Sequence, residues 1–141
     1  MGQARDVVDQ LMASVSTTKD LKTIVDLYAE DAVIVSPDKG EIAGREQIAG
    51  YIQSWLDSFP DFRVETQHKY EVGNVAIDEC YAYGTNTAAS TLLSGDRVEA
   101  TGKRLSLRTC DVITVDNGLI TRHHIYYDQA AVNSQLSDSP S

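Results

Sequence analysis

Cysteine is scarce in this 141-residue chain, which contains only Cys80 and Cys110. Two cysteines cannot form the disulfide framework of a small secreted domain, and their separation lacks the short spacing of zinc ligands. We therefore expect both to be small, buried and reduced side chains. The sequence gives no support for a metal site, and we expect the protein to work without a metal or another cofactor.

Long apolar runs and positive charge are also lacking. No stretch is long enough to span a bilayer, and the opening MGQARDVVDQ lacks the basic-then-apolar order of a signal peptide. Twelve Lys and Arg residues against 21 Asp and Glu residues give a formal net charge of −9. Such a charge disfavours binding to phosphate backbones and to anionic membranes. We expect a soluble, cytoplasmic protein with neither nucleic acid nor a membrane as its partner.

The chain does contain enough apolar material for one core. Hydrophobic residues make up 42% of the sequence, no shift in composition divides it, and it has no internal repeat or low-complexity segment. A chain of this length and composition is typical of one domain. We therefore expect residues 1–141 to form a single domain whose polar tail, residues 134–141, is frayed.

The first half of the chain has the apolar periodicity of helices, interrupted by one short β-branched run that Pro37 stops. Thr17 to Asp20 has the composition of a helix N-cap, and Pro60 ends the last helical stripe. We predict helices over residues 7–15, 21–28 and 45–59, and a short strand over residues 32–36.

After Pro60 the apolar pattern alternates with a period of two. It predicts four long strands joined by turns at residues 73–74, 94–96 and 117–118. Helices followed by antiparallel strands are typical of an α+β fold, here a curved antiparallel sheet wrapped around the helices. The predicted strands are residues 62–72, 75–87, 103–115 and 119–128.

The last two strands carry the most informative residues. If residues 103–115 alternate, one face carries apolar side chains and one carboxylate, Asp111. Removing an unpaired carboxylate from water costs much free energy, so Asp111 must be paired, protonated or functional. On the following strand, His123 shares a face with Ile125 and Tyr127.

Several strings along the chain, taken in order, resemble one family. They are DLYAEDAVIVSP, the helix start at Gly44 to Ile48, SFPDFRVE, and the ending NGLITRHHIYYDQAAVNSQL. These strings resemble the SnoaL-like polyketide cyclase branch of the nuclear transport factor 2-like superfamily. The resemblance implies a cone-shaped α+β barrel with an internal pocket between the curved sheet and three N-terminal helices, often in a homodimer. It specifies little chemistry, because the superfamily includes isomerases, cyclases, dehydratases, epoxide hydrolases and binding proteins.

The positions that carry chemistry in the related enzymes are changed in this chain. In the ketosteroid isomerase pattern the general base falls on Ser36 and the phenolic donor on Met12, and only the accompanying acid is matched, by Asp111. The acid/base aspartate of the SnoaL-type cyclases falls on Ile125. Neither serine nor isoleucine can accept a proton at neutral pH. The resemblance therefore implies a new substrate or a non-catalytic role.

Asp111 and His123 are the strongest candidates for proton transfer. A carboxyl on an apolar face can stay protonated and donate a proton, and histidine suits acid/base work near neutrality. Each also has an ordinary interpretation, a buried ion pair for the one and a satisfied core residue for the other. We expect them to pair across the hairpin inside the pocket, which requires a three-residue loop with Val115 opposite Leu119. A two-residue turn would place His124 opposite Asp111.

Further residues are candidates for contact with a ligand, and each has a second interpretation. Tyr28 and Trp55 lie on helical stripes and belong to the core, although their rings could line a cavity. His68 either lines the pocket or is packed in the core. Asp78 is a second pocket acid if the small side chains of its strand face inward, and a solvated residue if the aromatic ones do. The predicted ligand-binding residues are Tyr28, Trp55, His68, Asp78 and Tyr127, and we interpret Asp128 as a structural cap after the last strand.

Two functions of different classes remain open. The first is a cofactor-independent isomerase, cyclase or lyase that uses Asp111 and His123 for acid/base chemistry on a small apolar or carbonyl-containing molecule. The second is a non-catalytic module that binds a hydrophobic ligand or dimerises. The polar pair on an apolar face favours the first, and the changes at Ser36 and Ile125 favour the second. We also expect a homodimer that buries the outer face of the sheet.

Overall fold

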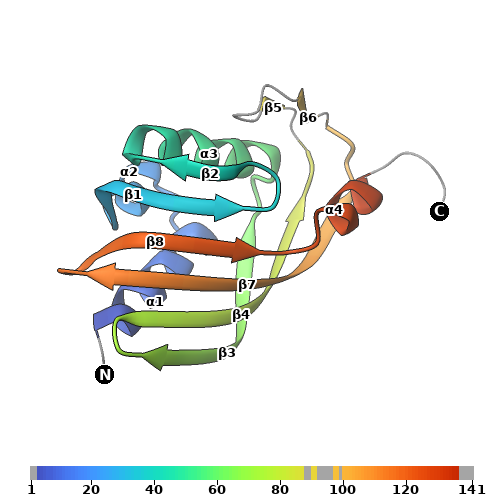
Figure 1. The fold of residues 1–141 in the computed structure, drawn as a ribbon. Helices are drawn as coiled ribbons and strands as arrows, with labels where there is room; N and C mark the ends of the chain where they lie inside the picture. The colour runs from blue at the N-terminus through green and yellow to red at the C-terminus, as the bar shows by residue number, and fades with distance from the viewer. Residues whose placement is uncertain (1–2, 88–89, 92–96, 99, 137–141) are drawn as a thin grey trace.

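The computed structural model describes residues 3–87, 90–91, 97–98 and 100–136 (Figure 1). A curved, unclosed six-stranded sheet has the strand order β2-β1-β8-β7-β4-β3, and a separate two-stranded sheet pairs β5 with β6. The elements are α1 (Gln3–Ser16), α2 (Leu21–Val25), β1 (Tyr28–Ser36), β2 (Gly40–Ala43), α3 (Arg45–Ser58), β3 (Arg63–Val72), β4 (Val75–Thr85), β5 (Ser90–Thr91), β6 (Arg97–Val98), β7 (Arg104–Asp116), β8 (Leu119–Tyr126) and α4 (Gln129–Leu136).

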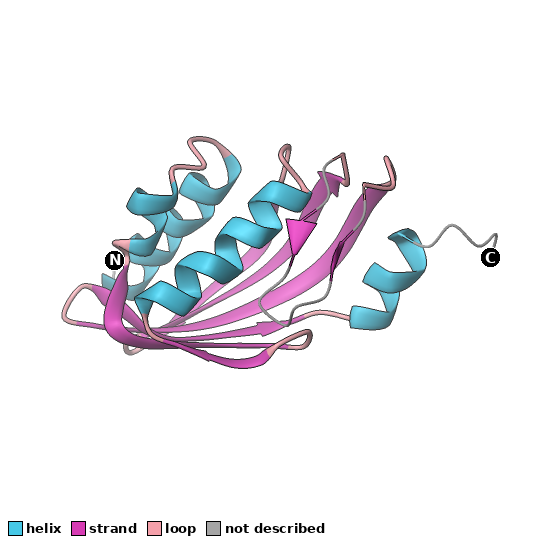
Figure 2. Ribbon diagram, turned by 90° about the horizontal axis from the view of Figure 1, so that it is seen from above, coloured by secondary structure: helices cyan, strands magenta, loops and turns pink. Residues whose placement is uncertain are grey.

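The predicted α+β class is confirmed. Figure 2 shows the three N-terminal helices on one face of the curved sheet, with α4 standing apart near the C-terminus. The four long strands and the third helix begin and end within about two residues of their predicted bounds, as is usual for such boundaries. The predicted turn at residues 94–96 lies outside the described residues. None of the described helices is long and apolar enough to cross a membrane.

Several details differ from the prediction. The second helix ends at Val25, and Tyr28 begins the first strand. That strand, β1, pairs in parallel with β8, whereas the other pairings in the large sheet are antiparallel. Residues 134–136, expected to be frayed, form the end of α4. Asp128 caps this helix as predicted, because its Oδ1 accepts hydrogen bonds from the backbone N–H groups of Ala130 at 2.9 Å and Ala131 at 3.3 Å.

The Gln135 side chain bonds helix α4 to the edge of the sheet. Strand β8 pairs with β7 only from Cys110 onward, so the earlier part of β7 has a free edge on that side. The Gln135 side chain fills part of it: its Oε1 accepts from Ser106 N at 2.8 Å and its Nε2 donates to Ser106 O at 2.9 Å. This arrangement satisfies backbone groups that a neighbouring strand would otherwise pair.

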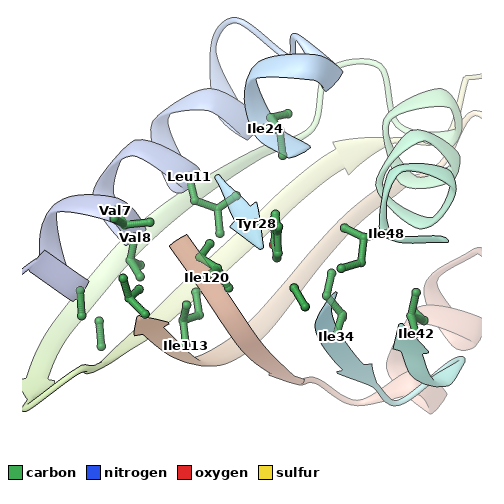
Figure 3. Close-up of a cluster of buried hydrophobic side chains, with 14 of the residues drawn as sticks. Val7, Val8, Leu11, Ile24, Tyr28, Ile34, Ile42, Ile48, Ile113 and Ile120 are labelled. Carbon is green, nitrogen blue, oxygen red and sulfur yellow. The ribbon is translucent and has the colours of Figure 1, made fainter. Parts of the chain in front are cut away.

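The apolar core divides into two clusters between the helices and the sheet. The first joins α1, α2 and α3 to the inner faces of β1, β7 and β8 (Figure 3). Its large members include Val8, Leu11, Ile34, Ile113 and Ile120. The second cluster joins the end of α3 to β4, β7 and α4, and its buried members are Phe59, Ala82, Leu105, Leu107 and Val132.

Gly84 permits the close contact between α3 and β4. A Cβ atom at this position would lie 2.9 Å from Cβ of Phe59, closer than carbon atoms of packed side chains approach each other. The ring of Phe59 can therefore cover the strand only because residue 84 has no side chain.

Candidate functional site

A cavity of about 140 Å³ lies between the inner face of the sheet and helices α1 and α3. Members of both core clusters border it, so most of its wall is apolar. The polar side chains that reach it are those of Tyr28, Tyr51, Trp55, Thr109, Asp111, His123 and Tyr127.

Three of these side chains form one hydrogen-bonded line. The Tyr28 hydroxyl lies 2.8 Å from Nδ1 of His123, and Nε2 of His123 lies 2.7 Å from Oδ1 of Asp111. The three residues are 1%, 5% and 8% exposed, so the line is almost fully removed from water. The parallel pairing of β1 with β8 brings Tyr28 to His123, and the β7–β8 hairpin brings Asp111.

The predicted contact between Asp111 and His123 is present, but the predicted register of the hairpin is wrong. Asn117 and Gly118 have φ values of 52° and 79° and form a two-residue turn, with Asp116 opposite Leu119. A bulge in β8 then shifts the pairing, so that Asp111 lies opposite Ile125. His123 and Asp111 are therefore diagonal neighbours on the inner face, still within reach of each other.

The protons on this line can be assigned from the surroundings of Tyr28. Burial raises the pKa of the Tyr28 hydroxyl well above its ordinary value, and the charge of Asp111 raises it further. The phenol therefore stays protonated and can donate to Nδ1 of His123; in that arrangement the imidazole proton is on Nε2 and is donated to Asp111 Oδ1. Oδ2 of Asp111 makes no hydrogen bond to any described residue, so the line ends at a carboxylate oxygen with free lone pairs.

Trp55 and Tyr127 also reach the cavity. Trp55 stacks on Phe59, with ring centroids 5.4 Å apart, and meets Tyr127 edge-on at 6.1 Å. Tyr28 reaches the cavity from a strand, whereas the sequence placed it on a helix.

His68 does not line the cavity, contrary to the prediction. The β3–β4 pairing shifts between Thr66 and His68, so that Thr66 faces Cys80 on the inner side while His68 faces Glu79 on the outer side. His68 is exposed. A bulge of one residue exchanges the two faces of a strand, and the alternation seen upstream of Thr66 cannot reveal it.

Asp78 differs from both of its predicted interpretations. The small side chains of β4 do face inward, and Asp78 is fully buried, but it does not border the cavity. Its Oδ1 lies 2.6 Å from Nη2 of Arg5 on α1, which also contacts Asp9 at 2.9 Å. Asp78 is therefore one half of a buried ion pair that joins helix α1 to the sheet.

The sequence did not single out a second polar array near the cavity. Ser36 Oγ and the Tyr51 hydroxyl donate to the same oxygen, Oδ1 of Asp38, over 2.7 Å and 3.1 Å. Asp38 lies in the turn after Pro37, and Tyr51 lies on the apolar stripe of α3. The apolar helical stripe that contains Tyr51 gives no sign of where its hydroxyl points.

Both cysteines are free, as predicted. Cys80 is buried, and that burial raises the pKa of its thiol to about 11, whereas Cys110 is only partly buried. Among the described residues, no group of three or more His, Cys, Asp and Glu side chains could hold a metal ion.

Comparison with known proteins identifies one family. The sequence profile of the SnoaL-like domain matches residues 8–123. A protein from Jannaschia sp. CCS1, provisionally assigned as a SnoaL-like polyketide cyclase, is 16% identical, with 98% of this chain and 94% of that chain covered and a TM-score of 0.84. IdmH from Streptomyces antibioticus, provisionally assigned as a polyketide cyclase, is 25% identical, with 96% and 99% covered and a TM-score of 0.76.

A third structure is that of SalBIII, an epoxide hydrolase/cyclase-like enzyme in pyran ring formation in the polyether salinomycin. It is 19% identical to this chain, with 91% of this chain and 92% of that chain covered and a TM-score of 0.75. No curated protein matches the sequence significantly.

Proposed function

Because this chain belongs to the SnoaL-like domain family, we propose that its cavity binds a small, mostly apolar ketone and that Asp111, held in place by His123, moves a proton on it. The reaction would be a cofactor-independent isomerisation, cyclisation or elimination. The observation that carries this proposal is the buried line from Tyr28 through His123 to Asp111, which ends at an open carboxylate oxygen beside an apolar cavity.

The chemistry follows from the proton assignment. Oδ2 of Asp111 accepts the proton from a carbon next to the ligand carbonyl, which leaves an enolate and a neutral carboxyl group. The same carboxyl then returns the proton to another atom of the ligand. His123 holds Asp111 in place through Nε2–H, and Tyr28 fixes that tautomer from the other side of the ring.

The alternative is a non-catalytic module that binds a hydrophobic ligand. One observation favours it: both ring nitrogens of His123 already have protein partners, so the imidazole can exchange a proton with a ligand only if one of these contacts breaks. The changes at Ser36 and Ile125 point the same way, because they remove the bases of the related enzymes.

Deuterium exchange separates the two functions. We expect the protein to accelerate exchange of the C1 protons of 2-tetralone, a bicyclic ketone, by about tenfold or more over buffer at neutral pH. Proton NMR in D2O follows the exchange, and calorimetry measures binding in the same samples. Binding without accelerated exchange would support the non-catalytic module instead.

We further propose a homodimer that buries the outer face of the sheet. Tyr81 and Tyr83 stack on that face with ring centroids 6.2 Å apart, and Tyr126 is 54% exposed. Aromatic side chains are enriched where proteins associate. Light scattering should give the dimer mass at micromolar concentration, and Tyr126→Glu should shift the protein toward the monomer. Thr18→Glu, which adds the same charge on the helix side, should not; a monomeric parent would refute the dimer.

A further inference from the structure

The turn after β1 and the chain after β8 meet at one end of the cavity. These two strands run parallel, so Asp38 and Tyr127, which follow them, lie at the same end of the sheet. Helix α3 supplies Tyr51 to this end. The Tyr51 and Tyr127 rings border the cavity, and Asp38 lies behind them.

The hydrogen bonds at this end leave one donor and one acceptor unused. Tyr51 donates its only hydroxyl proton to Asp38, and the Trp55 side chain interacts with its oxygen, which leaves one lone pair for a further donor. The Tyr127 hydroxyl is buried and makes no hydrogen bond of acceptable geometry within the described residues. Burial and the neighbouring Asp38 carboxylate raise the pKa of both phenols above the ordinary value, so each keeps its proton.

We propose that Tyr51 and Tyr127 form a second polar subsite, which binds a hydroxyl group of the ligand. The ligand hydroxyl would donate to the Tyr51 oxygen and accept from the Tyr127 hydroxyl, so that one group satisfies both. Asp38 is a positioning residue that fixes the direction of the Tyr51 proton. The inference rests on the proposed function, because it concerns the same cavity and the same ligand.

The spacing of the two polar arrays describes the ligand further. Asp111 lies opposite Ile125, and Tyr127 follows Ile125 by two positions, about 7 Å along an extended chain; His123 precedes Ile125 by two positions on the same face. The apolar side chain of Ile125 lies between His123 and Tyr127 and also borders the cavity. The ligand class is therefore an elongated, apolar molecule with a carbonyl group toward Asp111 and a hydroxyl group at the other end. A carboxylate in place of the hydroxyl has no proton to donate to Tyr51 and is repelled by Asp38.

Three matched ketones test the subsite. We expect the parent protein to bind 6-hydroxy-2-tetralone about tenfold more tightly than 2-tetralone, the net effect of about one good hydrogen bond. We expect 6-carboxy-2-tetralone to bind more weakly than either. In Tyr127→Phe the preference for the hydroxyl should fall, because only the bond to Tyr51 remains, while the dissociation constant of 2-tetralone stays the same. Calorimetry gives all of these values.

Tyr126→Phe is the matched control, because Tyr126 is exposed and does not border the cavity. It should keep the full preference for the hydroxyl. Equal binding of the first two ketones by the parent, or an undiminished preference in Tyr127→Phe, would overturn the subsite and leave the proposed function intact. If 2-tetralone binds but its C1 protons do not exchange, the proton-transfer proposal fails while the subsite is judged by the hydroxyl preference alone. If none of the three ketones binds, both fail.

Discussion

In Asp111→Asn, exchange of the C1 protons of 2-tetralone is expected to fall by about 10²- to 10⁴-fold, the usual contribution of a positioned acid or base. Asparagine has the shape of aspartate, and its oxygen can still accept the Nε2–H of His123, but neither of its polar atoms can take up a proton at neutral pH. The dissociation constant of the ketone should change by less than about threefold, because the cavity wall is otherwise unchanged.

His124→Gln provides the control for this variant. His124 is next to His123 in sequence, but it lies opposite Val112 in the β7–β8 pairing and does not border the cavity. Its replacement should leave the exchange rate unaltered. If Asp111→Asn exchanged deuterium as fast as the parent, Asp111 would not be the base, and the buried line would be structural.

Arg5→Met is expected to lower the free energy of unfolding by about 3 to 5 kcal/mol, the usual cost of removing one partner from a buried ion pair. The Asp78 side chain is completely buried, and Arg5 is its ionic partner among the described residues. Methionine fills much of the volume of arginine but leaves the carboxylate without a compensating charge. Urea unfolding followed by circular dichroism measures the loss.

The double variant Arg5→Met/Asp78→Leu tests whether the unpaired charge of Asp78 causes the loss of stability in Arg5→Met. Removing both charges should recover most of the lost stability, because a buried ion pair contributes little beyond an apolar pair of similar volume. Lys22→Met removes one partner of an exposed ion pair, and its effect should be small because water screens that pair. If Arg5→Met were as stable as the parent, Asp78 would take up a proton without cost in stability.

Strand faces could be predicted from the sequence where the alternation is unbroken. Strand β7 keeps its period over its whole length, so Asp111 was placed correctly on the inner face. The same argument failed for His68, because the bulge after Thr66 exchanges the faces of β3. The two-residue turn made the predicted hairpin register wrong, and a second bulge, in β8, kept His123 on the inner face in contact with Asp111.

The second polar array could not be predicted, because it depends on contacts between distant elements. Tyr127, after the last strand, was predicted to bind a ligand, but Asp38 lies in a turn and Tyr51 on a helical stripe, and neither of these two positions is unusual in the sequence. The pairing of β1 with β8 brings Asp38 and Tyr127 together. Parallel pairing leaves little mark on a short strand such as residues 32–36, whose apolar run fits either direction.

The position of β1 between β2 and β8 has a consequence for the order in which the molecule can fold. Tyr28 and His123 are separated by 95 residues in the sequence, and their strands are neighbours in the sheet. During synthesis, β1 can pair with β2 at once. Its other edge can pair with β8 only after nearly the whole chain has been synthesised. Contacts of such high sequence separation slow folding, because a long loop must close before they form. The buried line of the site therefore assembles late, and a ribosome-bound chain that ends before β8 will lack it.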